Sequence, residues 1–320
     1  MPGGMRDTKR VIPDSPDVRE RYNMVGILTG ESVLTVRGFL QILKLRIGIM
    51  IALTSVIGYL AVANQINGQQ LAMLTLAMLL GAAGSSVFNH FYDRDIDRLM
   101  SRTAHRPLAS GAMRRPQLVP WLAAGFLLSG FSLAAITLNW IVAMHLLLGA
   151  FFYGIVYTVW LKRRTWLNVV IGGAAGSFAV LAGAAAVDPT IWLLPWLLAL
   201  ILFLWTPSHF WALAILLKED YQRANVPMLP CLVGEKRTVH YIFVNSLLLV
   251  GASLLPWLVG ELGHWYGLGT LIAGLWFMWL NIQLVRTPNR VMAHATFIGS
   301  MQYLLGVFLS VLADKHLPWP

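Results

Sequence analysis

Cysteine and charge are both scarce in this sequence of 320 residues. The single cysteine, Cys231, excludes an intrachain disulfide framework and any metal site built from several thiolates. Only 12% of the residues are charged and 57% are hydrophobic, which is typical of a protein with several membrane spans. No polar stretch beside the apolar runs is long enough for a soluble domain of any size.

Residues 1–38 carry mixed charge and contain no continuous apolar run. Because no short apolar core follows the basic residues, we expect a cytoplasmic tail here and not a signal peptide. Nine apolar segments follow, each near the ~20 residues that cross a hydrocarbon core. We therefore predict an all-α polytopic membrane protein, in which residues 39–320 form a bundle of nine transmembrane helices with a central cavity. The predicted spans are 42–63, 70–91, 118–138, 141–161, 167–187, 191–216, 239–260, 264–285 and 293–313.

The basic residues fall on one side of this predicted bundle. Of the 24 Lys and Arg residues, all except Lys315 lie in the N-terminal segment or in alternate loops on the same side. By the positive-inside rule this side is cytoplasmic, which predicts a cytoplasmic N-terminus and a C-terminus outside. The formal charge of +10 therefore reflects topology, and we expect no nucleic-acid partner.

A charged stretch directly follows the second predicted span. Asn89, Asp93 and Asp97 are spaced by four residues, so on a helix they share one face, whereas Asp95 points away. Oxygen ligands at one-turn intervals suit Mg²⁺, which prefers to complete its shell with substrate phosphate oxygens. The stretch predicts a metal-bridged diphosphate site. The alternative is a set of interfacial salt bridges and helix caps.

Four arginines recur at the same interval in this stretch. On a continuous helix they would form a basic stripe beside the acidic one, and guanidinium groups match the geometry of phosphate. Acidic and basic stripes side by side strengthen the expectation of a diphosphate ligand. The four residues are Arg94, Arg98, Arg102 and Arg106.

A second charged stretch, residues 205–230, begins inside the sixth predicted span. If the helix continues, His209 and Asp220 share a face at depths that differ by ~16 Å. Pro207 is expected to kink this helix, and such kinks commonly mark a cavity. For His209 two interpretations stay open: a hydrogen bond to a neighbouring helix, or ligation of iron. Asp220 is either a second metal or phosphate-water ligand, or a solvated loop carboxylate.

These motifs resemble a known family. The run Asn89-x3-Asp93-x3-Asp97, followed by Arg102-Thr103-x2-Arg106-Pro107-Leu108, resembles the first aspartate-rich motif of UbiA-type intramembrane prenyltransferases. Within that superfamily, three further runs of this sequence resemble the protohaem IX farnesyltransferases, which make haem O. They are Trp205-Thr-Pro-x-His209-Phe-Trp-Ala-Leu, Lys218-Glu-Asp-Tyr-x4-Val-Pro-Met-Leu-Pro and Tyr157-Thr-x2-Leu-Lys162-Arg163.

The resemblance covers the chain from about residue 40 to its end, with two departures. Lys44-Leu45-Arg46 stands where the family usually has Lys-Pro-Arg. The run Asn168-x2-Ile171-Gly-Gly-Ala-Ala-Gly176 also resembles that family, but the following run from Ser177 to Gly183 lacks the Pro pair and the Trp that are expected there. Neither departure touches the expected metal ligands, but the second concerns the acceptor pocket.

The resemblance implies transfer of the farnesyl group from farnesyl diphosphate to a vinyl group of haem b, with water addition. The products are haem O and diphosphate, Mg²⁺ is the cofactor, and haem b is a substrate. His209 is the leading candidate for contact with the iron, with His90 and His105 behind it. The expected catalytic residues are Asn89, Asp93, Asp97, Arg102, Arg106 and Tyr157; the substrate-binding residues are Lys44, Arg46, Lys162, His209, Asp220 and Tyr221; the metal ligands are Asn89, Asp93, Asp97 and Asp220.

Further partners implied by the resemblance are membrane lipid and either haem A synthase or the terminal oxidase assembly. The expected location is the cell inner membrane, with the active site facing the cytoplasm. Three other functions were weighed: a UbiA-type enzyme with an aromatic acceptor such as 4-hydroxybenzoate, a cation-coupled transporter and an assembly scaffold. The first needs no iron ligand, and the second predicts charge nearer the bilayer centre. A scaffold does not explain the ordered carboxylates.

Overall fold

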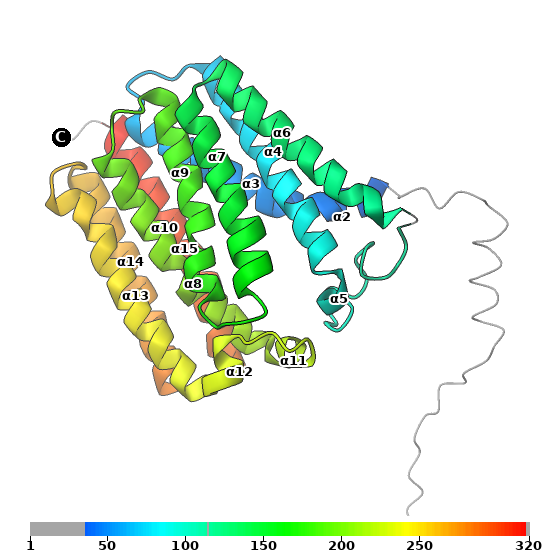
Figure 1. Ribbon diagram of the computed structural model, residues 1–320. Coiled ribbons are helices and arrows are strands. Elements are labelled where there is room, and N and C mark those ends of the chain that lie inside the picture. Colours follow the sequence, from blue (N-terminus) through cyan, green and yellow to red (C-terminus); the bar gives the residue numbers. More distant parts are fainter. Residues whose placement is uncertain (1–35, 114, 318–320) are drawn as a thin grey trace, which may run out of the picture.

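The computed structural model describes residues 36–113 and 115–317. Within this part every regular element is a helix, and nine helical segments are long and apolar enough to cross a membrane (Figure 1). This confirms the predicted all-α polytopic fold. The nine segments are α3 (Leu45–Val62), α4 (Gly68–Tyr92), η1 with α6 (Pro116–Leu118 and Val119–Thr137), α7 with η2 (Trp140–Phe151 and Phe152–Leu161), α8 with α9 (Asn168–Gly172 and Ala174–Val187), α10 (Leu193–Leu216), α13 (Glu235–Leu258), α14 (His264–Arg286) and α15 (Arg290–His316).

The ends of these segments agree with the predicted spans to within a few residues. The largest difference is at α13, which begins at Glu235 and not at residue 239. An apolar window cannot detect a charged first turn, and Glu235, Lys236 and Arg237 form that turn here. Length and apolarity therefore locate the spans, whereas polar residues extend the helices beyond the hydrocarbon core.

Helices α9 and α10 lie at the centre of the bundle. In each of them 61% of the most apolar window is buried, compared with 22% in the segment that contains α6. Large side chains such as Trp121 and Ile136 are exposed on the outside, where lipid would cover them. Inside the bundle, small residues allow helices to approach closely.

The closest such approach joins α3 and α9. A Cβ atom added at Gly58 would overlap the carbonyl oxygen of Val180, and one added at Gly183 would overlap the carbonyl oxygen of Ser55. The two glycines thus lie on facing helices, each against the backbone of the other. Only glycine fits at these two positions, and this contact fixes α9 beside α3.

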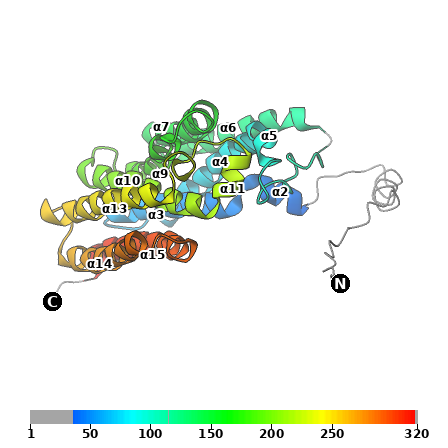
Figure 2. The same cartoon turned by 90° about the horizontal axis from the view of Figure 1, so that it is seen from below.

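The two ends of the bundle differ. Short turns connect the helices at one end, whereas residues 93–113 and 217–234 form long connections at the other. Figure 1 and the perpendicular view in Figure 2 place three short helices at this second end, which we call the charged end. The three helices are α5 (Arg94–Asp97), α11 (Lys218–Arg223) and α12 (Leu229–Val233).

An additional short helix, α2 (Val36–Leu43), precedes the first span and was not predicted. Its Ile42 and Leu43 pack with Val87 of α4 in an apolar cluster. The chain then turns at Lys44, which has a φ of 48° and so lies in the left-handed region. Most of the predicted tail, residues 1–38, lies outside the described residues.

The contact between α3 and α9 predicts that Gly183→Ala destabilises the protein by about 1–3 kcal/mol, because the new methyl group overlaps backbone that cannot move away. Gly176→Ala on the same helix is the matched control, since nothing lies within 4 Å of a Cβ at that position. The measurement is the thermal unfolding midpoint of each purified variant in detergent. Equal midpoints for the two variants would contradict the tight contact.

Candidate active site

A buried carboxylate occupies the centre of the charged end. Asp93 follows the last residue of α4 and has no exposed surface. Its Oδ2 accepts a hydrogen bond from Asn89 Nδ2 at 2.8 Å and forms an ion pair with Lys162 Nζ. Its Oδ1 lies 3.7 Å from the Arg163 guanidinium and accepts no hydrogen bond. Asp93 is therefore charge-compensated, with one oxygen available for another ligand.

Asn89 connects this carboxylate to α3 and η2. Its Nδ2 also lies 3.1 Å from Thr158 Oγ1, and its Oδ1 accepts a hydrogen bond from Lys44 Nζ at 2.6 Å. Lys44 Nζ is also 3.4 Å from the Tyr153 hydroxyl. Burial, and then the charges of nearby Arg106 and Lys162, lower the pKa of Lys44 to about 7. Three cationic side chains, Lys44, Arg106 and Lys162, thus gather near two carboxylates, Asp93 and Asp97, and this excess of positive charge favours an anionic ligand.

The third residue of the predicted acidic motif is also buried. Asp97, at the end of α5, forms an ion pair of 2.7 Å with Arg106. Its carbonyl oxygen accepts a hydrogen bond of 2.9 Å from Thr103 Oγ1, which holds the following turn against it. We call the assembled group the Asp93 cluster; it consists of Lys44, Asn89, Asp93, Asp97, Arg106 and Lys162.

Lys162 reaches Asp93 because the end of the fourth span is a π-helix. At about 3.6 residues per turn, residues nine apart on an α-helix point in opposite directions. In η2 the wider turn, with hydrogen bonds between residues five apart, brings Tyr153 and Lys162 to the same side. The Tyr153 and Tyr157 rings stack at 5.8 Å, and Lys162 Nζ lies 5.8 Å from the centre of the Tyr157 ring. The predicted span over 141–161 is confirmed as a helical segment, but its second half is a π-helix and not an α-helix.

Asp95 lies outside the cluster, in the direction expected from its spacing. Its side chain is 60% exposed and accepts two hydrogen bonds of 2.6 Å from Arg163. These hydrogen bonds hold the pKa of Asp95 below its usual range. The Arg163 guanidinium also lies 5.1 Å from the centre of the Tyr92 ring. This pair anchors the turn after η2 to the end of α4.

The predicted basic stripe is wrong, because α4 ends at Tyr92 and helical geometry stops at Asp97. The arginines therefore diverge. Arg98 donates to the carbonyl oxygen of Ala109 at 2.6 Å, while Arg106 turns back to the cluster. Arg94 donates to the Phe91 carbonyl oxygen. The side chains of Arg102 and Arg46, both expected to bind substrate or stabilise charge, are exposed and outside the cluster.

Asp220 lies apart from His209, and the expectation of a shared helix face is wrong. Helix α10 ends at Leu216 and α11 begins after a break. The Asp220 carboxylate accepts hydrogen bonds from the backbone N–H and the hydroxyl of Ser101, at 3.1 and 2.8 Å, and from the backbone N–H of Arg102 at 3.4 Å. Burial alone would raise the pKa of this carboxyl, but these hydrogen bonds bring the pKa below its usual range.

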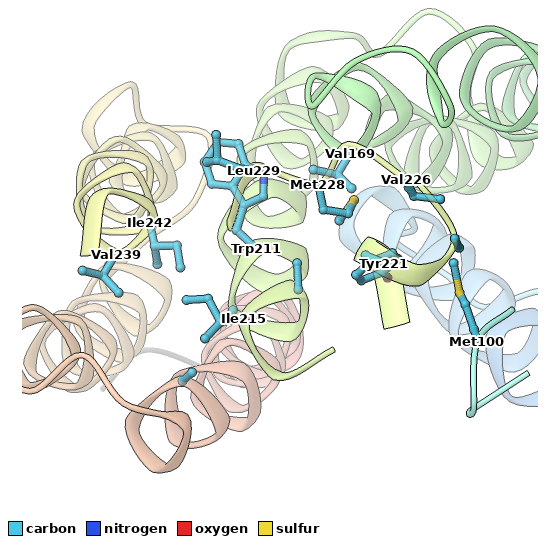
Figure 3. Packing of buried hydrophobic residues seen from close by; sticks show 14 of the residues in the cluster. Met100, Val169, Trp211, Ile215, Tyr221, Val226, Met228, Leu229, Val239 and Ile242 are labelled. Atoms are coloured by element: carbon cyan, nitrogen blue, oxygen red, sulfur yellow. The ribbon is translucent and has the colours of Figure 1, made fainter. Parts of the chain in front are cut away.

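An apolar contact reinforces this connection between the two long loops. Met100 is buried in a cluster with Tyr221, Val226 and Met228. Figure 3 shows Met100 entering the cluster from the opposite side to Met228. Tyr221, expected to bind substrate, is thus part of the packing that holds residues 98–104 against α11. Asp220 and Met100 together position the segment that carries Arg106.

His209 is buried in α10 between two aromatic rings. The Trp205 and Phe297 rings stack on it at 4.3 and 4.5 Å, and its Nδ1 lies 2.8 Å from Ser300 Oγ. This is the arrangement expected for a histidine that is hydrogen-bonded to a neighbouring helix. Of the other two candidates, His105 is exposed, whereas His90 is buried in α4 with no hydrogen bond to either ring nitrogen.

An apolar cavity of about 80 Å³ begins beside the Asp93 cluster. It lies between α3, α4, α7 and α9. Tyr153, which contacts Lys44, and Ser86, one turn before Asn89, line its near end. Neither Tyr153 nor Thr158 was expected at the site. The π-helical register that brings them there has no simple signal in the sequence.

The donor atoms of the cluster fit a hard divalent cation. Asn89, Asp93 and Asp97 offer carboxamide and carboxylate oxygens, and Oδ1 of Asp93 is buried without a hydrogen bond. Among the described residues no three His, Cys, Asp or Glu side chains converge as a metal site. A cation at the cluster would take the Asn89 oxygen beside the two carboxylates. The structure does not bring Asp220, a predicted fourth ligand, to this group.

We expect Asp220→Ala to release residues 98–104, because the hydrogen bonds from Ser101 and Arg102 lose their acceptor. The measurement is hydrogen exchange of the backbone amides in this segment, which should become faster by at least about 10-fold, since the backbone N–H groups of Ser101 and Arg102 both lose their acceptor. Glu219→Ala is the matched control, because this neighbour is 82% exposed and lies 3.9 Å from Arg290. Unchanged protection in Asp220→Ala would show that other contacts hold the segment.

Comparison with known proteins gives consistent results. The model of the UbiA prenyltransferase family matches residues 49–311. A protein of Paramagnetospirillum magneticum named protoheme IX farnesyltransferase 1 is 57% identical over 283 residues, which cover 88% of this chain and 100% of that protein. Protoheme IX farnesyltransferase 2 of the same organism is 44% identical over 278 residues, 87% of this chain and 96% of that protein.

Solved structures show the same fold at low sequence identity. A digeranylgeranylglyceryl phosphate synthase has a TM-score of 0.74 at 21% identity, over 88% of this chain and 99% of that one. A UbiA homologue from Archaeoglobus fulgidus, bound to DMAPP and Mg²⁺, has a TM-score of 0.62 at 17% identity, over 85% of this chain and 98% of that one. Together with the matched family model and the close relatives, these likenesses show that the chain belongs to the UbiA prenyltransferase family.

Proposed function

We propose that this protein transfers the farnesyl group of farnesyl diphosphate to a vinyl group of haem b, with addition of water, to give haem O and diphosphate. The names of the two Paramagnetospirillum magneticum relatives support this acceptor over an aromatic one. The observation that carries the proposal is the position of the Asp93 cluster at the near end of an apolar cavity. A prenyl diphosphate has the same division into a charged head and an apolar tail.

The cations of the cluster would bind the diphosphate head. Lys44, Arg106 and Lys162 lie within one group. In the protein alone Lys44 donates a hydrogen bond to Asn89, while Arg106 and Lys162 form ion pairs with Asp97 and Asp93. Their side chains can turn from these acceptors to phosphate oxygens, where guanidinium and ammonium groups form charge-assisted hydrogen bonds. Arg102, exposed on the same loop, would close on the diphosphate from the solvent side.

Asn89, Asp93 and Asp97 would hold Mg²⁺, whose oxygen donors they match. When bound, the metal neutralises the charge that develops on the leaving diphosphate. Low dielectric strengthens this stabilisation, because Asp93 and Asp97 are buried. The carbon–oxygen bond of the substrate breaks, the vinyl carbon attacks the allylic carbon, and water adds to the resulting cation and loses a proton. The chain needs no nucleophilic side chain for these steps.

The stacked tyrosines would face the developing allylic cation. Tyr153 lines the cavity and contacts Lys44 of the cluster, and Tyr157 stacks on it, so that aromatic faces at this position can stabilise positive charge. The apolar walls of the cavity would also keep water from the cation until the vinyl group has attacked. The basic residues on the charged end support a site that faces the cytoplasm of a cell inner membrane.

The reaction is tested with purified protein, Mg²⁺, farnesyl diphosphate and haem b, with mass spectrometry of the haem product. Asp93→Asn should lower the rate by at least about 100-fold, because it removes the charge that holds the metal and Lys162. Asp95→Asn, two residues away and exposed, should stay close to the wild type. Turnover with 4-hydroxybenzoate in place of haem b would contradict the proposed acceptor.

We also propose that His209 contacts haem, and this role has its own test. His209→Ala should raise the KM for haem b by at least about 10-fold, because one ligand or packing contact is lost, and leave the KM for farnesyl diphosphate unchanged. Ser300→Ala is the control, because it removes only the hydrogen bond to Nδ1. Equal effects of the two variants on both substrates would assign His209 a structural role only.

A further inference from the structure

The cavity is elongated along the helix axes, and its lining residues on four helices each show where it begins and ends. On α4 its lining residues run from Ser86, three residues before Asn89, to Met78, and on α7 and η2 they run from Tyr153 to His145. Each run spans nine residues, which places its first and last residues about 12 Å apart along a helix axis. The lining residues of α3 and α9 begin at the same end. The cavity therefore extends from the Asp93 cluster into the bundle and ends at the level of Met78 and His145.

The far end is closed by two large side chains. Met78 and Leu146 both line the cavity and both belong to the buried apolar cluster that fills the bundle beyond it. Leu74 and Val142, which lie one turn further, have no exposed surface. A Cβ added at Gly81 would lie 2.9 Å from Leu146, so Gly81 allows this leucine to fold across the cavity. The floor is thus made of Met78 and Leu146.

Between this floor and Tyr153, the wall residues that α4 and α7 contribute are small. Gly81, Ala82, Ser85, Gly149 and Ala150 leave the space between α4 and α7 open. The two floor residues therefore limit the length of the cavity and not its width.

From these observations we infer that Met78 and Leu146 set the length of the prenyl tail that the protein accepts. The inference rests on the proposed function, because it places the diphosphate at the Asp93 cluster and the tail along the cavity. A tail longer than the distance from Tyr153 to Met78 would have to displace the floor, whereas a shorter one would leave empty apolar space. Both mismatches lower the rate with the wrong chain length.

The test compares prenyl diphosphates of 10, 15 and 20 carbons as donors to haem b in the purified protein. Met78→Ala lengthens the cavity and should raise the kcat/KM for the 20-carbon donor relative to the 15-carbon donor by at least about 10-fold. Ala82→Leu fills the middle of the cavity and should shift the preference towards the 10-carbon donor. Because the two variants act in opposite directions, the result does not depend on the folding of either one alone.

Leu76→Ala is the matched control, since Leu76 lies on the same helix but is 45% exposed and does not line the cavity. It should keep the wild-type preference. Turnover of the 15-carbon donor with unchanged preference in both cavity variants would overturn the inference alone. Absence of turnover in the wild type with every donor would overturn the proposed function and the inference with it.

Discussion

The buried ion pair between Asp93 and Lys162 is the interaction on which the charged end depends. A carboxylate without exposed surface beside an apolar bundle is costly unless a cation compensates it. This pairing holds the end of α4 against η2, and the wider turn of η2 is what allows Lys162 to reach it. Removal of one partner would leave an uncompensated buried charge. Lys162 and the other cations of the Asp93 cluster also lie close enough to one another to bind a diphosphate together.

The bundle beneath this cluster combines tight and loose packing. Gly58 and Gly183 bring α3 and α9 into backbone contact, whereas small residues on α4 and α7 leave a cavity beside that contact. The rigid pair gives the cavity a fixed wall. The loops are held separately, through Asp220 and Met100, so that the segment with Arg106 is positioned from α11 and not from the spans. The loops of the charged end would thus bind the charged head of a ligand, and the spans around the cavity would bind its apolar tail.

Sequence patterns predicted the spans well because length and apolarity are local properties. The spacing also predicted Asn89, Asp93 and Asp97 as site residues, the family resemblance added Lys44 and Lys162, and the structure brings these side chains together. Three features depend on contacts between distant segments, and spacing alone could not predict them. Helix α4 ends at Tyr92, so the arginines do not form one stripe. The π-helix places Tyr153 at the site. Ser101, which is 119 residues away in the sequence, donates hydrogen bonds to Asp220.

The most direct test of the central claim is a structure of the protein with an unreactive farnesyl diphosphate analogue and Mn²⁺, located by its anomalous signal. The account predicts the metal at Asn89, Asp93 and Asp97, the diphosphate against the cations of the Asp93 cluster, and the tail in the cavity. A metal ion and diphosphate bound at Asp220, with the Asp93–Lys162 pair unchanged, would contradict it.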